Sequence, residues 1–406
     1  MTSQILIAKN MPASRLRSLF LFVCLVLCLP YMSGAEEPKE KELSGNAGEE
    51  AASVPVSATG EAADREKGGL GITPFPVIYY TPETSLAIGG GVVFTLRDEG
   101  ESMETRPDNL QVMTAYTLNN QFFLTLAPEK YFNDQRGRLF MNVGYLNWPT
   151  SFFGVGNDSD IDIDDIEELE ETYTDESLFL QPWILHAVVA DLSMGLTLDW
   201  ENAHIKDVGD GGVLEQGDLI GAEGGIRSGV GPAITWDTRD NLFAPSRGSW
   251  HMAWAWIYRE WMGSDFDYEY YGLNLRHYRP MARESVLALQ GFVALTSGEV
   301  PFNEYPTPLM RGLYENVFTD KNAMVVRAEV RFPINFLPGE RWGAAVFGSV
   351  GDAFPDATTP EDIDLKVAGG AGLRFALNKQ EKINVRLDLG VSRYGVFPYI
   401  MLQEAF

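Results

Sequence analysis

The stretch MVVRAEVRF, residues 324–332, decides the fold, because its side chains alternate strictly between two kinds. In an extended strand, such alternation gives one apolar face and one charged face. The apolar face consists of Val326, Ala328, Val330 and Phe332, and the charged face of Arg327, Glu329 and Arg331. A soluble sheet turns its charged face to bulk water. A transmembrane barrel instead turns that face to a polar lumen and its apolar face to lipid.

Repetition of the pattern favours the barrel. Residues 367–377 and 383–392 again place charged and small side chains on one face and Val, Leu and Phe on the other. After Leu70, no segment keeps the helical period of about 3.6 residues over three turns. Alternating segments of about ten residues, separated by turn residues, are typical of outer-membrane strands. The sequence therefore predicts an all-β fold, a transmembrane antiparallel β-barrel over residues 70–406.

The number of strands is expected to be even, because both ends of such a chain lie in the periplasm. Roughly sixteen alternating segments can be counted. Fourteen strands stay possible if the first segment, FPVIYYT at residues 75–81, lies inside the barrel as a plug.

The N-terminal segment predicts export. Lys9, Arg15 and Arg17 precede an apolar run at residues 19–29, and small residues follow at positions 33–35, as in a secretory signal peptide. We expect residues 1–35 to be this signal, with cleavage after Ala35. The alternative is a retained anchor, for which the run is short. Residues 36–69 are charged and free of aromatics, which predicts a disordered periplasmic tether.

Composition argues against several classes of function. The formal net charge of −26 disfavours nucleic acid as a partner, because phosphate contacts need clustered Lys and Arg. Both cysteines, Cys24 and Cys28, lie in the expected signal, so the mature chain would lack disulfides and thiolate metal sites. The four histidines show no metal-ligand spacing, and no Gly-x-Ser-x-Gly elbow is present. We therefore predict no cofactor, no metal site and no enzyme.

Two further segments carry predictions of their own. Residues 158–176 are rich in Asp and Glu without Lys or Arg, which predicts a solvated acidic loop, with loose binding of divalent ions as the alternative. In SWHMAWAWIYRE, residues 249–260, three tryptophans share one face, and we expect them in the aromatic girdle at the membrane interface.

The C-terminal third of the chain resembles a known family. LMRGLYENVFTDKN, residues 309–322, is followed by RAEVRFP, VFGSVGDAF and GGAGLRFAL. This order resembles outer-membrane assembly and secretion barrels of the BamA/TamA type, the bacterial surface antigen family, over about residues 70–406. The resemblance implies a long extracellular loop whose Arg-Gly-aromatic tip folds back into the lumen. Here the tip is Arg311-Gly312, with Leu313 at the aromatic position.

The resemblance also implies site residues. The family's Phe-x-Asp-x-Gly strand matches residues 347–351, which puts Ser349 at the acceptor position of the loop arginine. We therefore expect Arg311 to pair chiefly with Glu329, with Asp352 close by, because a buried guanidinium needs partners. Phe406 would be the C-terminal aromatic read by the assembly machinery. A periplasmic turn motif is expected at Asp237, Arg239, Asp240, Pro245 and Gly248.

The implied function is insertion or translocation of protein or lipid at the bacterial outer membrane. Family members with that role carry periplasmic polypeptide-transport-associated domains, and the tether at residues 36–69 is too short for one. A passive pore or structural barrel is therefore the alternative, and an outer-membrane hydrolase with a Ser-His pair across strands a distant one. Expected partners are outer-membrane lipid and lipopolysaccharide, the assembly machinery during biogenesis, and a client polypeptide or periplasmic protein.

Overall fold

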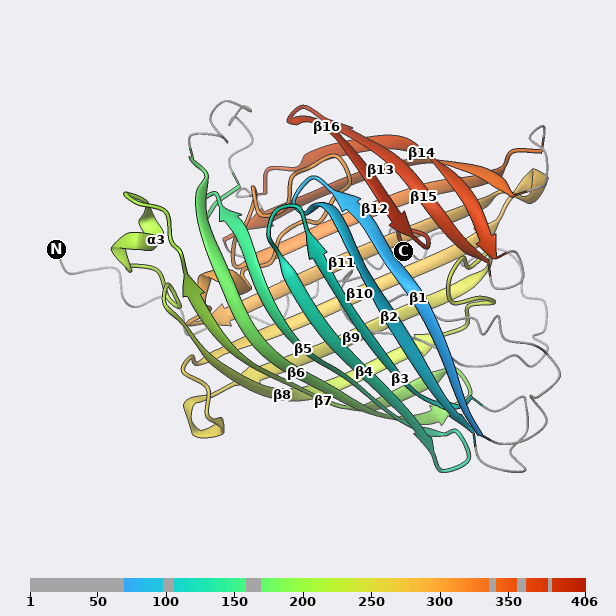
Figure 1. Cartoon of the computed structure of the whole chain (residues 1–406), viewed down its shortest axis with the longest axis horizontal. Coiled ribbons are helices and arrows are strands. Elements are labelled where there is room, and N and C mark those ends of the chain that lie inside the picture. The colour runs from blue at the N-terminus through green and yellow to red at the C-terminus, as the bar shows by residue number, and fades with distance from the viewer. Residues whose placement is uncertain (1–68, 98–105, 158–168, 336–340, 356–362, 379–381) are drawn as a thin grey trace.

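The computed structural model describes residues 69–97, 106–157, 169–335, 341–355, 363–378 and 382–406. Within these residues, sixteen antiparallel strands form a closed barrel in which each strand pairs with the next and β16 returns to β1 (Figure 1). The predicted sixteen-stranded barrel is confirmed. Residues 75–81 form part of β1 in the wall, so the fourteen-stranded alternative is wrong.

The strands of the wall have the following bounds. They are β1 (Gly69–Thr81), β2 (Ser85–Arg97), β3 (Asp108–Thr117), β4 (Phe122–Phe132), β5 (Gly137–Phe152), β6 (Glu171–Val189), β7 (Leu192–Lys206), β8 (Gly224–Asp237), β9 (Gly248–Tyr258), β10 (Tyr268–Pro280), β11 (Val286–Gly298), β12 (Asn322–Pro333), β13 (Trp342–Phe354), β14 (Lys366–Asn378), β15 (Ile383–Ser392) and β16 (Gly395–Leu402). Short helical turns are α3 (Val213–Gln216), η2 (Glu260–Met262), η3 (Ala282–Glu284) and η4 (Phe302–Glu304). No helix in the described part is long and apolar enough to cross a membrane.

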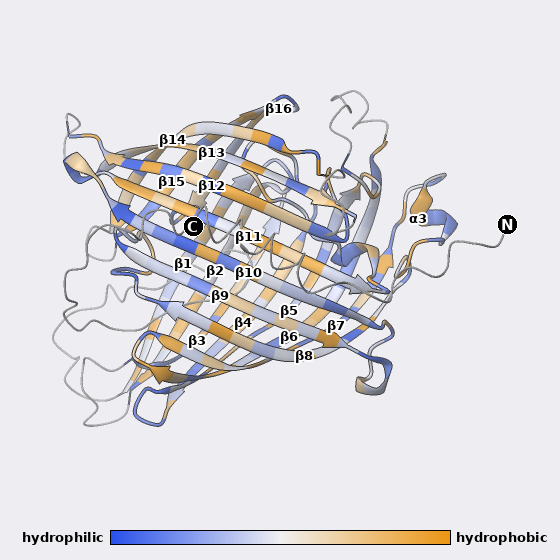
Figure 2. Ribbon diagram, turned by 180° about the vertical axis from the view of Figure 1, so that it is seen from behind, coloured by the Kyte–Doolittle hydropathy of each residue, from blue (hydrophilic) through white to orange (hydrophobic). Residues whose placement is uncertain are grey.

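Hydrophobic and hydrophilic residues are interspersed along the strands (Figure 2), and the two faces of the wall differ in chemistry, as the alternation predicts. On β12, the side chain of Glu329 is buried in the lumen, whereas that of Phe332 is exposed on the outer face. The same division holds on β15, where Asp388 is buried between the exposed Leu387 and Leu389. The outer face is therefore an apolar belt suited to lipid. Other exposed members of this belt include Ile78, Ile88, Leu178, Ile184, Leu196, Val346, Val367, Leu373, Val396 and Ile400.

The connections define the two ends of the barrel. Long segments at residues 153–170, 207–223, 299–321 and 355–365 leave one end, and short turns such as residues 133–136 and 190–191 close the other. Outer-membrane barrels have short periplasmic turns and longer extracellular loops. The end with the long segments is therefore assigned to the cell exterior. The predicted signal, nearly all of the predicted tether and residues 158–168 of the acidic loop lie outside the described residues.

The predicted place of the β9 tryptophans is wrong. Trp250 is buried inside the barrel with Phe140 and Trp183, and the partly buried Trp254 and Trp256 pack against the same cluster. The indole N–H of Trp256 donates to Thr197 Oγ1 at 3.3 Å. Alternation correctly put these side chains on one face, but it could not say that this face of β9 is the lumenal one.

Candidate functional site: the lumen loop and the strand seam

The segment between β11 and β12, residues 299–321, crosses the lumen and is here called the lumen loop. Its first part lies against the wall formed by β5 and β6. Phe302 is buried between Phe152 and Tyr173, with ring centroids 5.4 and 5.3 Å away. The Phe302 N–H donates to the carbonyl of Ile220 at 2.9 Å, which joins the lumen loop to the segment between β7 and β8.

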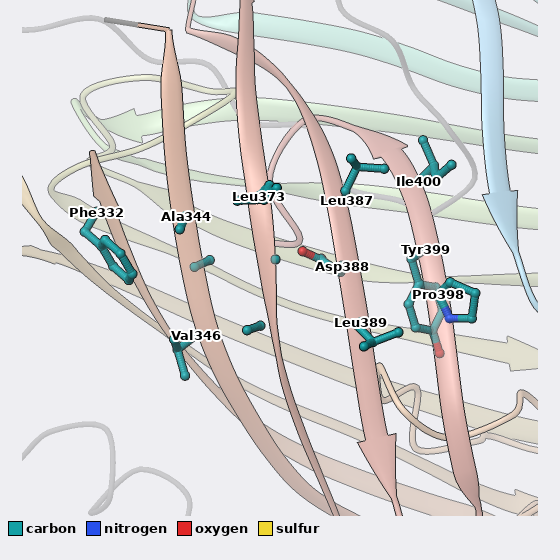
Figure 3. A pocket seen from close by; sticks show the side chains of 13 residues that line it. Phe332, Ala344, Val346, Leu373, Leu387, Asp388, Leu389, Pro398, Tyr399 and Ile400 are labelled. Carbon is teal, nitrogen blue, oxygen red and sulfur yellow. The ribbon is translucent and has the colours of Figure 1, made fainter. Parts of the chain in front are cut away.

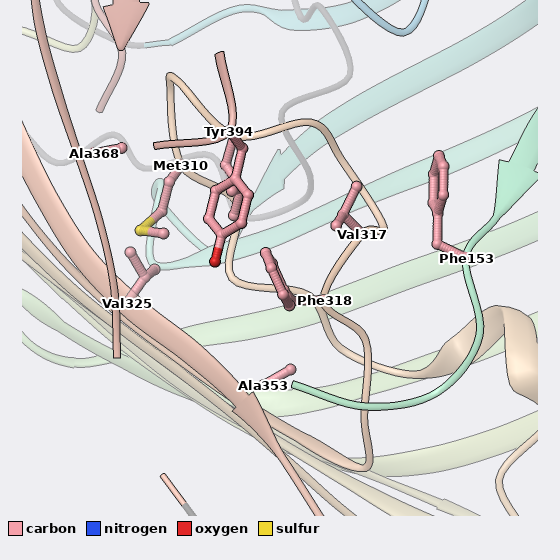
Figure 4. Packing of buried hydrophobic residues seen from close by; sticks show 9 residues of the cluster. Phe153, Met310, Val317, Phe318, Val325, Ala353, Ala368 and Tyr394 are labelled. Atoms are coloured by element: carbon pink, nitrogen blue, oxygen red, sulfur yellow. The ribbon is translucent and has the colours of Figure 1, made fainter. Parts of the chain in front are cut away.

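The second part of the lumen loop packs against the other side of the barrel (Figure 4). Met310, Val317 and Phe318 lie in one buried cluster with residues of β12, β13 and β14. The ring of Phe318 contacts Tyr394, with centroids 5.2 Å apart. Thr319 also forms a β-bridge with Gly156, in the segment between β5 and β6. The lumen loop is thus fixed as a folded element inside the barrel.

Arg311, at the tip of the lumen loop, bridges two carboxylates on different strands. Its guanidinium lies 2.5 Å from Glu329 Oε2 on β12 and 2.5 Å from Asp388 Oδ2 on β15. It also stands over the ring of Phe347, 3.6 Å from the centroid. Both carboxylate side chains have an exposed fraction of 0%. A planar fork with several N–H donors suits this two-sided geometry, which a lysine ammonium could not reproduce.

The Arg311 contacts belong to a larger network of buried charges, here called the lumen ionic cluster. Glu329 Oε1 accepts from Arg331 Nε at 2.7 Å, and Asp388 Oδ1 accepts from Arg374 at 2.5 Å. Because the arginines outnumber the carboxylates, each acid is neutralised from more than one side, as burial requires. The members are Arg311, Glu329, Arg331, Arg374, Arg386, Asp388 and Glu404.

Two predicted partners of Arg311 lie elsewhere. Ser349 pairs in register with Arg327, one step further towards the exterior than Glu329, and its hydroxyl donates to the Ala368 carbonyl at 3.5 Å. Asp352 lies at the end of β13, where it pairs with the buried Lys366 at 2.8 Å. Within the described residues neither one contacts Arg311, so both assignments are wrong.

Asp388 is the acceptor that sequence reasoning missed. The alternation of β15 puts Asp388 on the lumen side, so its charge was visible in the sequence. Its proximity to Arg311 was not, because the lumen loop and β15 are distant in sequence and Arg311 reaches both walls at once. The neighbouring strand gives a second clue. Gly372 of β14 pairs with Asp388 and has no side chain, which leaves room for the Asp388 carboxylate.

The lumen loop has a second ionic anchor on the far wall. Glu304, in η4, pairs with Arg227 of β8, which also pairs with Glu201 of β7. The Arg227 side chain is only 6% exposed. On the same wall, the buried Asp199 accepts from Gln181 at 2.6 Å and from the Tyr258 hydroxyl at 2.7 Å. Glu304 and Arg311 therefore tie one loop to opposite sides of the barrel.

The C-terminal tail turns into the lumen after β16 ends at Leu402. Glu404 accepts from Arg374 Nε at 2.7 Å, and the Phe406 main-chain oxygen accepts from Arg331 at 2.7 Å. The Phe406 ring is buried with Tyr278 and Ala288, from β10 and β11. The expected assembly signal therefore ends inside the barrel and not on the closing strand, and its reading by the assembly machinery stays a prediction.

The five residues of the predicted periplasmic turn form one compact unit between β8 and β9. Arg239 binds Asp237 through two bonds, Nε to Oδ1 at 2.9 Å and a terminal nitrogen to Oδ2 at 2.7 Å. Asp240 Oδ1 accepts from the Ser246 amide at 2.8 Å and the Arg247 amide at 3.2 Å.

Local geometry explains the charge and glycine requirements of this turn. Gly248 has φ +97°, and a Cβ there would lie 2.1 Å from the Thr238 carbonyl. Pro245 is buried within the turn. Partial burial acts to raise the pKa of Asp240, but the bonds from Ser246 and Arg247 outweigh it and hold that pKa below its usual value.

The junction of β1 and β16 is narrow. All 13 residues of β1 pair with β2, and all 8 residues of β16 pair with β15, but only Tyr80 and Ile400 pair across the junction. Three prolines, Pro74, Pro76 and Pro398, lie on these two strands and have no N–H to donate. We call this junction the seam.

The lumen loop contacts both sides of the seam from within. The Gly312 N–H donates to the Tyr399 hydroxyl of β16 at 3.1 Å, and the Glu315 N–H donates to Glu83 Oε1 at 3.1 Å, in the turn between β1 and β2. Outside the barrel, an apolar hollow of about 530 Å³ lies over β12 to β16 next to the seam. Leu373, Leu387 and Ile400 line this hollow (Figure 3).

No group of three or more His, Cys, Asp or Glu in the described residues is arranged to hold a metal ion. A cross-strand Ser-His pair does occur, with Ser249 Oγ and His277 Nδ1 2.9 Å apart. Among these residues no carboxylate orients His277, so the pair lacks the third member of a hydrolytic triad.

No family model matches the sequence, and no curated protein matches it. Among solved structures, BamA from Haemophilus ducreyi lacking POTRA domains 1-3 is similar at 14% identity, with a TM-score of 0.58, over 83% of this chain. CdiB from Escherichia coli is similar at 10% identity, with a TM-score of 0.54, over 81%. CdiB from Acinetobacter baumannii is similar at 8% identity, with a TM-score of 0.53, over 84%.

The aligned region spans 70%, 62% and 66% of those three chains, respectively, so this chain corresponds to about two thirds of their length. At such identities the likeness is one of architecture alone. The chain has the fold of the BamA and CdiB outer-membrane barrels.

Proposed function

We propose that this chain is an outer-membrane assembly or translocation barrel, which admits a polypeptide or lipid at the seam between β1 and β16. One observation carries the proposal, namely that a single register pair, Tyr80 with Ile400, joins the two strands. Every other neighbouring pair of strands shares several register pairs.

An unpaired strand edge in a membrane is unstable on physical grounds. Backbone N–H and C=O groups that face hydrocarbon without partners cost several kcal/mol each, on the order of a lost hydrogen bond in lipid. The edge of β1 from Gly69 to Tyr79 lacks partners on β16 in the described structure. An edge of this kind accepts an added strand, because the main chain of a client can supply the missing bonds.

The filled lumen argues against the alternative of a passive pore. The lumen loop is anchored by Glu304 on one wall and Arg311 on the other, and the tail ending at Phe406 occupies further space. In an open porin the interior would be a water-filled channel. Here the route for a large client is the wall itself, through the seam.

A reversible lock on the seam tests the proposal. In a chain with Cys24 and Cys28 replaced by serine, the pair Tyr80→Cys and Ile400→Cys places one cysteine on each seam strand. The matched control, Tyr80→Cys with Leu86→Cys, links β1 to β2 and leaves the seam free. Both chains are placed in liposomes with an unfolded client barrel, and folding of the client and ion conductance are measured together.

The seam lock should abolish acceleration of client folding when oxidised and restore it on reduction, while the control lock has no effect. Conductance without acceleration in the unlocked chain would identify a pore. Acceleration that persists in the oxidised seam lock would refute the role of the seam.

A further inference from the structure

Four polar side chains lie together on the outer face of β9 and β10, whose other outward residues include Ala253, Ile257, Leu273 and Leu275. Alternation places the four outside, because their chain neighbours Trp250 and Tyr278 are buried in the lumen. All of them lie near the turns at residues 238–247 and 281–285, at the end assigned to the periplasm. The four residues are Ser249, His251, His277 and Arg279, here called the outer polar cluster.

The outer polar cluster has unused hydrogen-bonding capacity. His251 Nδ1 is buried and has no hydrogen-bond partner within the described part of the chain. Arg279 is exposed, and no acidic side chain described here pairs with it. An ionisable side chain on the lipid face is best tolerated at the membrane boundary, where a lipid headgroup can supply its partner. An anion with several acceptor oxygens would supply partners to such donors.

The Ser249–His277 contact orients a donor towards that anion. When the Ser249 hydroxyl donates to His277 Nδ1, 2.9 Å away, the neutral imidazole carries its proton on Nε2. That N–H then points away from Ser249 and is available to a ligand. Together with the Arg279 guanidinium it supplies the donors that phosphate oxygens accept most strongly.

An apolar hollow adjoins the outer polar cluster. It measures about 360 Å³ and is lined by Val189, Leu192 and Trp236, with Ala190 and Asp191 in the adjoining turn. Trp236 connects the two features, because its ring stands edge-on to that of His251 with centroids 5.9 Å apart. A polar group beside an apolar hollow at the membrane boundary matches a lipid with a charged head and a hydrocarbon chain.

We propose that the outer polar cluster binds the phosphate of a phospholipid from the periplasmic leaflet, with an acyl chain in the hollow beside Trp236. Arg279 and His277 hold the phosphate oxygens, and Ser249 positions the His277 ring. In strand order, β9 and β10 lie across the barrel from β1 and β16. The lipid therefore anchors the wall opposite the seam, and its binding is independent of the proposed function.

The test uses the full chain in detergent with palmitoyl-oleoyl phosphatidylglycerol as the probe. Native mass spectrometry counts retained lipid across a titration, for the wild type, Arg279→Gln, His277→Asn and the double variant. His186→Gln is the matched control. His186 is an exposed histidine on the outer face of β6, near the end of the barrel that carries the outer polar cluster, and it lies opposite Met194 of β7. Heat-modifiable migration confirms that each variant folds.

We expect the double variant to bind the tightest lipid about tenfold more weakly, because it loses strong charged hydrogen bonds. Each single variant should weaken the binding by a smaller factor. His186→Gln should bind as the wild type does. Equal affinities in all variants, or equal weakening in His186→Gln, would overturn the proposal. Displacement of the lipid by inorganic phosphate at matched concentration would also overturn it, because the site would then recognise the free anion.

Discussion

Gly312 of the lumen loop lies directly against Gly390 of β15. A Cβ on Gly390 would stand 2.4 Å from the Gly312 nitrogen and 2.6 Å from the Arg311 carbonyl carbon. Gly312 itself has φ +106°, and its own Cβ would stand 2.7 Å from the Val391 nitrogen. The two glycines let the loop backbone approach the strand closely enough for Arg311 to span Glu329 and Asp388.

Replacing Gly390 by alanine should lift the loop tip from β15, because the contacts are with backbone that cannot rotate away. Overpacking of this kind costs about 1–3 kcal/mol. Single-channel conductance and proteinase K cleavage within residues 299–321 should both rise. Gly348→Ala is the matched control, since its added Cβ would meet nothing closer than 3.9 Å. Equal behaviour of the two variants would contradict the close approach.

Replacing Arg311 by alanine should release the tip and leave two buried carboxylates with fewer counter-charges. Breaking a buried ion pair from one side costs about 3–5 kcal/mol. Arg311→Lys should restore little of the attachment of the loop tip, since one ammonium cannot reproduce the forked contact with Glu329 and Asp388. Protease access to the lumen loop and conductance measure the release, with Lys321→Ala, an exposed position at the end of the same loop, as the control. A wild-type response from Arg311→Lys would argue against the bidentate bridge.

The sequence predicted much of this fold because alternation is a local property. The lumenal faces of β12 and β15 could be predicted from the alternation that places Glu329 and Asp388 there. The barrel follows from many such strands. Contacts between distant segments were not readable. The Arg311–Asp388 and Arg227–Glu304 pairs join a loop to strands far along the chain, and motif matching pointed to Ser349 instead. On β9, alternation predicted that the tryptophans share one face of the strand. It did not predict that this face is the lumenal one.

Asp240 should make the periplasmic turn sensitive to acid. Its pKa is lowered on folding, so it stabilises the folded state above its usual pKa of 3.8, and this contribution is lost as pH falls through the folded value. Asp240→Asn should cost about 2 kcal/mol at pH 7, on the scale of a hydrogen bond to a charged group. That difference should vanish in strong acid. Urea unfolding in lipid vesicles, followed by tryptophan fluorescence, measures it. A stability difference between Asp240→Asn and the wild type that does not change with pH would show that the Asp240 carboxylate is not its cause.

Arg227 and Glu304 should contribute unequally to the far anchor of the lumen loop. Glu304→Gln leaves Arg227 paired with Glu201, whereas Arg227→Gln leaves Glu201 and Glu304 without their shared cation. The arginine variant should therefore be the less stable, by about the 3–5 kcal/mol of an uncompensated buried charge. Glu299→Gln, at an exposed position of the same loop, should be neutral.

The two anchors should also act together on the lumen. With one anchor cut, the other still holds the lumen loop, so Glu304→Gln and Arg311→Ala alone should raise conductance modestly. The double variant should raise it by more than the sum, since only then can residues 299–321 leave the lumen. Strictly additive increases would mean that the two ends move independently, and that Glu304 and Arg311 do not hold one rigid strap across the barrel.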